Sequence, residues 1–436
     1  MSKLWSKSNT EELHPAVNKY IISKDLAADT ALVPFDIAAS KAHALMLSKV
    51  GLLSSDESSK LVSALEDLLA LHNKQEFVLR QESEDVHTEI ENYLIEKLGP
   101  LGKKLHVGRS RNDQVLVALR LYTKQALADS IDLTISLAET ILDFAQQHEF
   151  VPMPGFTHMQ HAMPSSIGQW AGAFVESLIN DVRILKATYE ILNQNPLGSA
   201  AGFGTGVPLD REETTRLLNF SKVQINPLFC QNSRSKFDAL AISSLLQVML
   251  TLGKVANDTV IFSSQEFGFL KIDKCVTTGS SIMPQKQNLD IMEVLRANVS
   301  VVQSLLVQVQ TAGLNLISGY NKDVKIGKKA VIDSFVIAQE SLKIVELLFK
   351  HLHPDKTNLL KAFDDVEIFA ADEANKLVAE GMAFRDAYRT VGENLKGLKK
   401  QDVEENIRSK KHIGATGNLC LEKYSQILSE LKSVKS

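Results

Sequence analysis

Apolar residues recur at helical spacing over several very long stretches of the chain. From Ser110 to about Glu149 there is neither Gly nor Pro, and the apolar positions mostly follow the helical period. A continuous helix of this length would extend about 60 Å at about 1.5 Å per residue. The same pattern predicts further long helices over residues 164–193, with Pro164 near the first turn, and over 237–267, 290–312 and 328–350. Helices this long cannot bury their apolar faces within a small globule, so we expect a long bundle shared between subunits.

The two ends of the chain carry shorter helical patterns, for example over residues 39–50 and 58–71. We therefore expect an all-α fold in which an elongated central helical bundle, residues 106–355, lies between two small helical domains. The N-terminal domain covers residues 1–105 and the C-terminal domain covers residues 356–436. The highly charged run over 396–411 is interpreted as a solvated face.

Composition supports long helices and excludes several classes of protein. The 436 residues include only 22 Gly and 11 Pro, so helix breakers are few. A net charge of -4 gives no electrostatic footprint for nucleic acid. No apolar segment follows the N-terminal residues as in a secretion signal, and no apolar run approaches the roughly 18 residues of a membrane span. Cys230, Cys275 and Cys420 are far apart and lack metal-ligand spacing, which favours a reduced, cytoplasmic setting.

Candidate chemistry gathers in three polar segments, each next to a long predicted helix. The segment Thr278–Asn288 holds two serines, a lysine and side-chain amides, while Gly279 and Pro284 oppose regular structure. Loops of this kind on a rigid scaffold concentrate binding and catalysis, although a mobile surface loop would have a similar composition.

The segment His106–Gln114 comes directly before the first long helix. Its backbone N–H groups and the guanidinium groups of Arg109 and Arg111 would form an anion site at the positive helix end. The alternative is an ordinary charged helix start capped by Ser110 or Asp113.

The segment Thr157–His161 carries two histidines three residues apart. Metal binding would need a third ligand, and no Asp or Glu lies close in sequence. The remaining interpretations are a polar turn before Pro164 and a site that uses one imidazole for acid–base work. The glycines at 202, 204 and 206 only superficially resemble a dinucleotide fingerprint, because the expected surroundings are helical, so we interpret them as a tight turn.

At these segments the chain resembles the fumarase/aspartase superfamily and, within it, the argininosuccinate lyases. The resemblance rests on Gly279-Ser-Ser-Ile-Met-Pro-Gln-Lys-Gln-Asn288, Gly108-Arg-Ser-Arg-Asn-Asp-Gln114 and Pro154-Gly-Phe-Thr-His-Met-Gln160. Weaker matches are Asp85-Val-His-Thr88, Gln265-Glu-Phe-Gly-Phe269 and Tyr320-Asn-Lys-Asp323. The resemblance spans essentially the whole chain.

The resemblance implies a homotetramer around a bundle of about twenty long helices. Each active site would take its three polar segments from three different subunits. The implied reaction is the reversible cleavage of the small molecule argininosuccinate to arginine and fumarate in arginine biosynthesis. It needs no metal and no organic cofactor.

The resemblance also implies roles for individual residues. Ser280 is the base on a flexible loop, His158 is the general acid near the leaving nitrogen, and Glu293 pairs with that imidazole. Lys286 would stabilise the Ser280 alkoxide when the loop closes and excludes water. The expected substrate-binding residues are Arg109, Ser110, Arg111, Asn112, Thr157, Gln160, Ser281, Lys286, Asn288, Tyr320, Lys325 and Lys328.

Three positions depart from the family pattern. Leu289 replaces the proline that usually follows the loop asparagine, and Lys325 replaces a neutral amide expected at the amino-acid end of the substrate. Asp25 stands where the family has a substrate-binding serine. The last two changes leave open a related lyase acting on an acylated argininosuccinate or another N-substituted aspartate. A non-catalytic structural protein, like the lens crystallins that resemble this lyase, is a further alternative.

Overall fold

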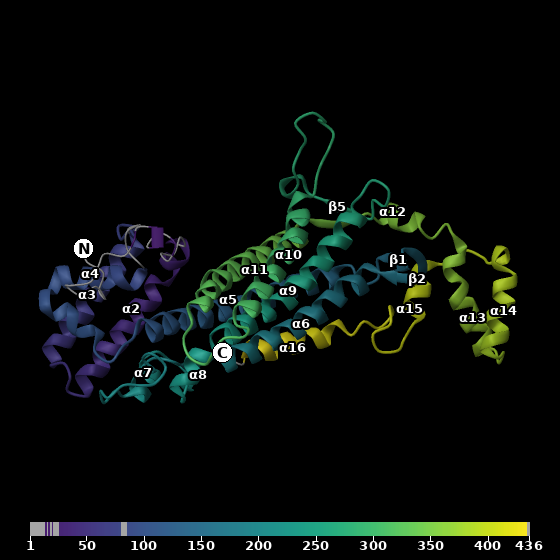
Figure 1. Cartoon of the computed structure of the whole chain (residues 1–436). Helices are drawn as coiled ribbons and strands as arrows, with labels where there is room; N and C mark the ends of the chain where they lie inside the picture. Colours follow the sequence, from purple (N-terminus) through teal and green to yellow (C-terminus); the bar gives the residue numbers. More distant parts are fainter. Residues whose placement is uncertain (1–13, 15, 18–19, 21–25, 80–84, 434–436) are drawn as a thin grey trace. The chain divides into compact units, whose positions relative to one another are not determined.

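The computed structural model describes residues 14, 16–17, 20, 26–79 and 85–433, and these residues are mostly helical with a few short strands (Figure 1). They form two compact units. Unit 1 contains residues 1–125, 191–239 and 308–332, and unit 2 contains residues 126–190, 240–307 and 333–436. Because each unit draws on three separate stretches, the expected division at residues 105 and 355 remains a prediction. Asp25 lies outside the described residues.

The long helices predicted from the apolar pattern are present. They are α5 (Arg111–Gln147), α6 (Ile167–Leu192), α9 (Arg234–Phe262), α10 (Asp290–Ala312) and α11 (Gly327–Lys350). The predicted all-α class is therefore confirmed. By length and composition α9 could cross a membrane, but most of its apolar window is buried inside the protein, as in the core helix of a soluble protein.

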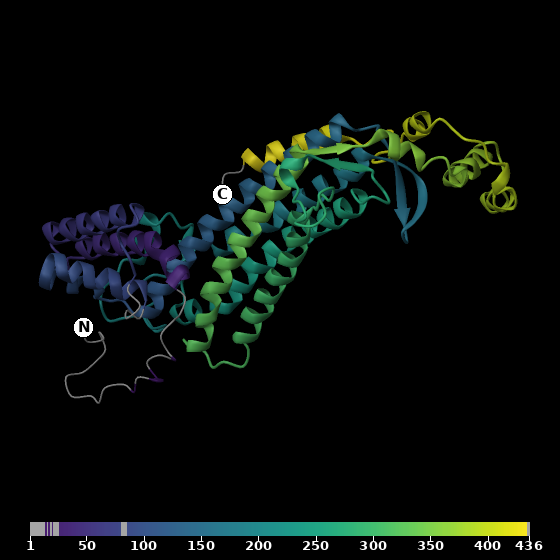
Figure 2. The same cartoon turned by 90° about the horizontal axis from the view of Figure 1, so that it is seen from above.

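In unit 1, the helices α2, α3 and α4 pack side by side, as both views show (Figure 1 and Figure 2). Ser54 and Glu57 form a capping box at the start of α3, and the Asp85 carboxylate caps α4 by accepting the Thr88 N–H. The elements of this unit outside the long helices are α2 (Leu26–Lys49), α3 (Ser55–Asn73), α4 (Val86–Leu98), η1 (Gly99–His106), β3 (Gln194–Asn195), α7 (Arg211–Leu217), β4 (Lys222–Val223), α8 (Pro227–Asn232) and η3 (Lys322–Ile326).

In unit 2, the long helices are held together by apolar contacts and a few buried polar links. Phe144 of α5 packs edge-on against Phe349 of α11. The Trp170 indole of α6 donates a hydrogen bond to Asp258 of α9 at 3.1 Å. The elements of this unit outside the long helices are β1 (Pro152–Thr157), β2 (Gln160–Ser166), β5 (Leu270–Ile272), η2 (Lys274–Val276), β6 (Leu352–Pro354), α12 (Lys356–Lys361), η4 (Val366–Phe369), α13 (Ala370–Ala379), α14 (Phe384–Glu393), η5 (Leu395–Gly397), α15 (Val403–Ser409) and α16 (Leu421–Ser433).

The start of the second long helix differs from the prediction. Pro164 belongs to β2, which pairs antiparallel with β1, and α6 begins only at Ile167. The Ser166 hydroxyl accepts the backbone N–H of Gln169 at 3.1 Å, which is the hydrogen bond of a helix cap. The cap therefore sets the start of the helix, and the proline lies in the strand before it.

Candidate active site

The segment Thr278–Asn288 is a loop between β5 and α10 in unit 2, and it extends beyond the ends of the helices (Figure 1). The backbones of Thr278 and Asn288 pair at its base through hydrogen bonds of 2.9 and 2.8 Å. The Thr278 hydroxyl also donates to Asp290 in the first turn of α10 at 2.6 Å. The loop is thus closed at its neck, and the residues between are mostly exposed.

Ser280 is half-buried within this exposed loop. Its Oγ accepts the backbone N–H of Met283 at 3.1 Å and that of Ile282 at 3.4 Å. Two donors directed at one oxygen favour its negatively charged form, because each stabilises charge that develops there. The local turn therefore supplies part of what a serine base requires.

His158 lies at the exposed tip of the β1–β2 hairpin. His158 and Met159 have φ values of 52° and 60°, and Thr157 pairs with Gln160 across the turn. Two-residue turns of this kind usually employ Asn or Gly, since positive φ is unfavourable for other side chains. Backbone strain of this kind clusters at functional sites and is consistent with a working role for His158.

The acid–base residues expected from the sequence are not joined to one another in a single chain. Ser280, Ser281 and Lys286 lie on the loop, Glu293 is exposed in the first turn of α10, and His158 is at the hairpin tip. Among the described residues, no hydrogen bond or ion pair links the side chains of Ser280, His158 and Glu293. Their catalytic roles remain predictions.

The segment before α5 is a capped helix start in unit 1. The Ser110 hydroxyl accepts the Asn112 N–H at 3.2 Å, and Asp113 accepts the Ser110 N–H at 2.9 Å. Asp113 also accepts the backbone N–H groups of Gly198 and Ala200, at 3.0 and 2.9 Å. These hydrogen bonds are those of a capped helix start. The expected anion-binding role of the segment is not excluded by the cap and remains a prediction.

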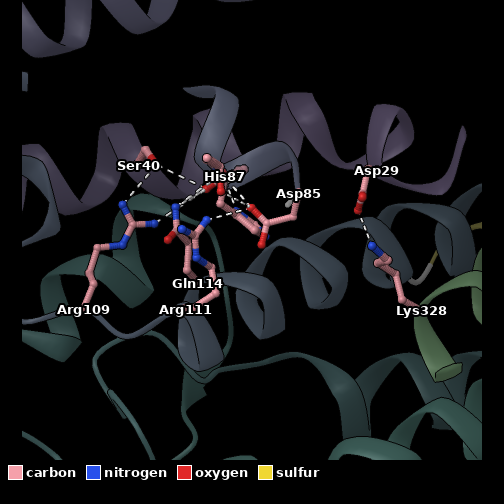
Figure 3. Close-up of polar contacts among 10 residues, drawn as sticks. Asp29, Ser40, Asp85, His87, Arg109, Arg111, Gln114 and Lys328 are labelled. Atoms are coloured by element: carbon pink, nitrogen blue, oxygen red, sulfur yellow. Dashed lines mark hydrogen bonds and ion pairs between the residues drawn. The ribbon is translucent and has the colours of Figure 1, made fainter. Parts of the chain in front are cut away.

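A cavity in unit 1 brings together the residues expected to hold the amino-acid end of the substrate. Its lining includes Arg111, Asn112, Tyr320, Lys325 and Lys328. The Arg111 guanidinium donates to Asp85 at 2.7 Å, and the buried Lys328 ammonium forms an ion pair with Asp29 (Figure 3). The remaining charged or polar lining residues are Asp29, Asp85, His87, Arg234, Asp238 and Lys322.

Arg234 was not identified from the sequence, yet it organises one wall of this cavity. Its guanidinium donates to the backbone carbonyl of Asn112 and lies 5.0 Å from the centre of the Tyr320 ring. A cation over an aromatic face is attracted by the ring quadrupole. Arg234 therefore contacts and supports Asn112 and Tyr320, two of the expected substrate-binding residues.

Lys325 differs from Arg111 and Lys328, which each form an ion pair in this cavity. Burial lowers the pKa of its ammonium, and the like charges of Lys328 and Lys322 lower it further. Within the described part of the chain no carboxylate forms an ion pair with it. The cavity therefore holds positive charge that suits an anionic ligand group.

Arg109, predicted to bind substrate, lies behind the cavity with its side chain 1% exposed. Its Nη1 donates to Ser40 at 3.1 Å, and its Nη2 lies 3.6 Å from Asp36. Gly108, with φ of 72°, makes the turn that leads into it. Arg109 is therefore not among the residues that line the cavity, and its role in binding substrate remains a prediction.

Asp29 and Asp36 were also missed in the sequence. They lie seven residues apart on α2, at i and i+7 of a helix, and both are buried. Two acidic residues at this spacing in the mostly apolar sequence of α2 are the signal that could have singled them out. Of the described residues, no group of three or more His, Cys, Asp or Glu side chains is arranged to hold a metal ion.

Comparison with known proteins places the chain in a family. A family profile described as "Lyase" matches residues 7–304. The chain is 41% identical to an argininosuccinate lyase of Thermotoga neapolitana over 90% of its own length and 98% of that protein. It is 38% identical to an argininosuccinate lyase of Phocaeicola vulgatus over 98% of its own length and 95% of that protein.

Solved structures share the fold. An EDDS lyase in complex with formate has a TM-score of 0.81 at 23% identity, and the match covers 97% of this chain and 91% of that protein. A Brucella melitensis protein titled fumarate lyase:delta crystallin has a TM-score of 0.75 at 19% identity, covering 97% of this chain and 94% of its own. The sequence relatives and the fold agree, and the chain belongs to the lyase family that includes the argininosuccinate lyases.

Proposed function

We propose that this protein is an argininosuccinate lyase, which reversibly cleaves argininosuccinate to arginine and fumarate. The observation that carries the proposal is the similarity to argininosuccinate lyases over nearly the whole chain. The segments quoted above supply the residue types that an elimination of this kind requires. The expected cytoplasmic setting belongs to the same proposal.

The reaction removes a proton from the carbon next to a carboxylate and then breaks the C–N bond. In the proposed mechanism Ser280 takes the proton, and the N–H groups of Ile282 and Met283 stabilise charge on its Oγ. The Lys286 ammonium would add to this effect when the loop closes. The intermediate carries extra negative charge on the carboxylate, so preorganised donors there contribute roughly 10²–10³ in rate by analogy with oxyanion holes.

His158 would protonate the leaving nitrogen, and Glu293 would orient its imidazole. The exposed tip of the β-hairpin suits this role, because it can project into a site formed with other segments. The remaining assignments place the succinyl carboxylates against Ser110, Thr157, Lys286 and Asn288, with Gln160 and Ser281 beside them. The arginine end would occupy the cavity of unit 1.

We infer a homotetramer in which each site is shared between subunits. The exposed side of α10 supports this, since its exposed positions include Val294, Val301 and Val307. Ala297, Ser300 and Ser304 are exposed on the same helix. Apart from the neighbours Ser300 and Val301, successive members of this set lie three residues apart, which places them along one face. A long apolar and small-residue face is typical of a surface that packs against another helix.

Fumarate release from argininosuccinate, followed by ultraviolet absorbance, tests the proposal. We expect steady turnover by the purified wild-type protein. A well-folded tetramer that releases no fumarate above background would contradict it and favour a structural role like that of a crystallin.

A second candidate is a lyase acting on an acylated argininosuccinate. The observation that favours it is Lys325, whose ammonium has no ion-pair partner among the described residues of the cavity. An acyl group removes the positive charge of the substrate's α-ammonium, and a nearby cation is then tolerated. Steady-state rates with both substrates decide between them, because a much larger kcat/KM for the acylated one would replace the first proposal.

A further inference from the structure

The Asp36 carboxylate does not line the cavity, but it contacts several polar side chains in and next to the cavity wall. Asp36 of α2 is 0% exposed. Its oxygens lie 2.6 Å from His87 Nδ1, 3.2 Å from Ser40 Oγ and 3.6 Å from Arg109 Nη2. The Gln114 amide nitrogen is 3.4 and 3.5 Å from the two oxygens (Figure 3).

Two of these partners flank the segment that faces the cavity. Arg109 comes just before α5 and Gln114 lies in its first turn, while Arg111 and Asn112 between them line the cavity. Both flanks reach the same carboxylate. Their attachment to Asp36 fixes how the first turn of α5 is rotated, and with it the direction of the two side chains between.

The third partner of Asp36, His87, lies close in sequence to Asp85, the residue that binds Arg111. His87 stands two residues after Asp85, whose carboxylate holds the Arg111 guanidinium at 2.7 Å. A shift of His87 would therefore move the start of α4 and the oxygen that orients Arg111. Asp36 therefore contacts residues next to both members of the Arg111–Asp85 pair and contacts neither member itself.

The charge of Asp36 is stable in this setting. Burial works to raise the pKa of its carboxyl, but the charges and hydrogen bonds of His87, Arg109 and Gln114 lower it to about 2. The group is ionised across the neutral range and balances the buried Arg109 guanidinium. Four polar side chains converge on this buried charge, so displacing any of them leaves the charge less well compensated.

We propose that Asp36 is a positioning residue for the leaving-group half of the site, holding Arg111 and Asn112 in their substrate-binding orientation. It touches no substrate and acts through Arg109, Gln114 and His87. The inference rests on the proposed function, because it assigns Arg111 and Asn112 to the arginine end of the substrate.

A double-mutant cycle tests the proposal. We would measure kcat and KM for argininosuccinate with Asp36→Asn, Arg111→Ala and the double variant. Loss of a supporting partner typically costs about 10–100-fold in activity, and we expect Asp36→Asn to act mainly through KM. The double variant should be little worse than Arg111→Ala, because once the Arg111 side chain is absent Asp36 has only Asn112 left to position. Effects that multiply fully would overturn the proposal.

Asp181→Asn is the matched control, because Asp181 is also a buried carboxylate but belongs to unit 2. Its effect on kcat/KM should combine multiplicatively with that of Arg111→Ala. If Asp36→Asn does not fold, Gln114→Leu replaces it in the cycle, because this variant removes the amide contact to Asp36 and leaves the charged groups in place. A folded Gln114→Leu enzyme with unchanged KM would count against the proposal.

Amide hydrogen exchange separates this inference from the proposed function. In Asp36→Asn or Gln114→Leu, amides of residues 109–114 should exchange faster, while those of residues 177–181 should not. Unchanged exchange at 109–114 would overturn the positioning role even in an inactive protein. A wild-type protein that releases no fumarate, yet shows the expected exchange, would overturn the proposed substrate alone.

Discussion

At the scale of single residues, the chemistry of the loop depends on how Ser280 is held. A serine hydroxyl is a weak base, and its alkoxide forms only where donors and cations stabilise it. The loop already directs two backbone N–H groups at Oγ. The remaining stabilisation would come from Lys286 and the substrate itself when water is excluded.

Replacing Ser280 tests this directly. We expect Ser280→Ala to lower kcat by at least about 10²–10⁴, the usual contribution of a general base, while the oligomer stays intact. The matched control is Thr277→Ala, whose hydroxyl donates to the Lys274 carbonyl at the base of the loop. Near-normal kcat in Ser280→Ala would remove this residue from the mechanism.

Lys325 belongs to the same scale, because the prediction concerns the ammonium group of one side chain in the cavity. If its ammonium binds the α-carboxylate of the arginine end, Lys325→Gln should raise KM for argininosuccinate by roughly tenfold with little change in kcat. Steady-state kinetics measure this. A lower KM in the variant would mean that Lys325 repels the α-ammonium, as the acylated substrate predicts.

The sequence singled out candidate residues that stand in compact motifs, and it missed those that act from a distance. Ser280 and His158 became candidates because their neighbours form recognisable segments. Asp36 is more than seventy residues from Arg109 and Gln114; only the packing of α2 against the start of α5 brings them together. Helical periodicity shows that such a position is buried, not which partner it meets.

At the scale of elements, long uninterrupted helices were predictable and the β-hairpin was not. Few Gly and Pro residues and a steady apolar period determined α5, α9, α10 and α11 to within a few residues. The hairpin has prolines at 152, 154 and 164, which gave no alternating strand pattern to recognise. Pro164 was consequently assigned to the helix that follows.

A buried acid between two of these helices gives a test of stability against pH. Burial raises the pKa of Asp181 on α6 to about 6, opposed by the hydrogen bond that Thr251 of α9 donates at 2.7 Å. The folded state therefore binds this proton more tightly than the unfolded chain, whose pKa is near 3.8. This favourable contribution is complete at low pH and is lost as pH rises through about 6.

Asp181→Asn should remove that dependence, because the amide keeps an acceptor for Thr251 and carries no charge. At about 1.4 kcal/mol per pKa unit, we expect a few kcal/mol more stability than wild type at pH 7.5 and little difference at pH 4. Thermal unfolding at both pH values measures it, with the exposed Asp143→Asn as control. An equal effect of Asp181→Asn at both pH values would show that charge is not the cause.

At the scale of the whole molecule, the three polar segments are either exposed or line a cavity. The loop with Ser280 and the hairpin tip with His158 are exposed in a single chain, and Arg111 and Asn112 line a cavity of unit 1. The sequence alone indicated that helices of this length need partners. Separate exposed segments with the proposed catalytic residues, and an exposed apolar face on α10, are what a shared site in an oligomer requires.

Subunit complementation tests this central claim most directly. His158→Ala and Ser280→Ala, each inactive alone, would be mixed under conditions in which subunits exchange, and fumarate release from argininosuccinate would be measured. If His158 and Ser280 of one site come from different subunits, random mixing restores up to about a quarter of the wild-type activity. No recovered activity, despite verified subunit exchange, would contradict the shared site.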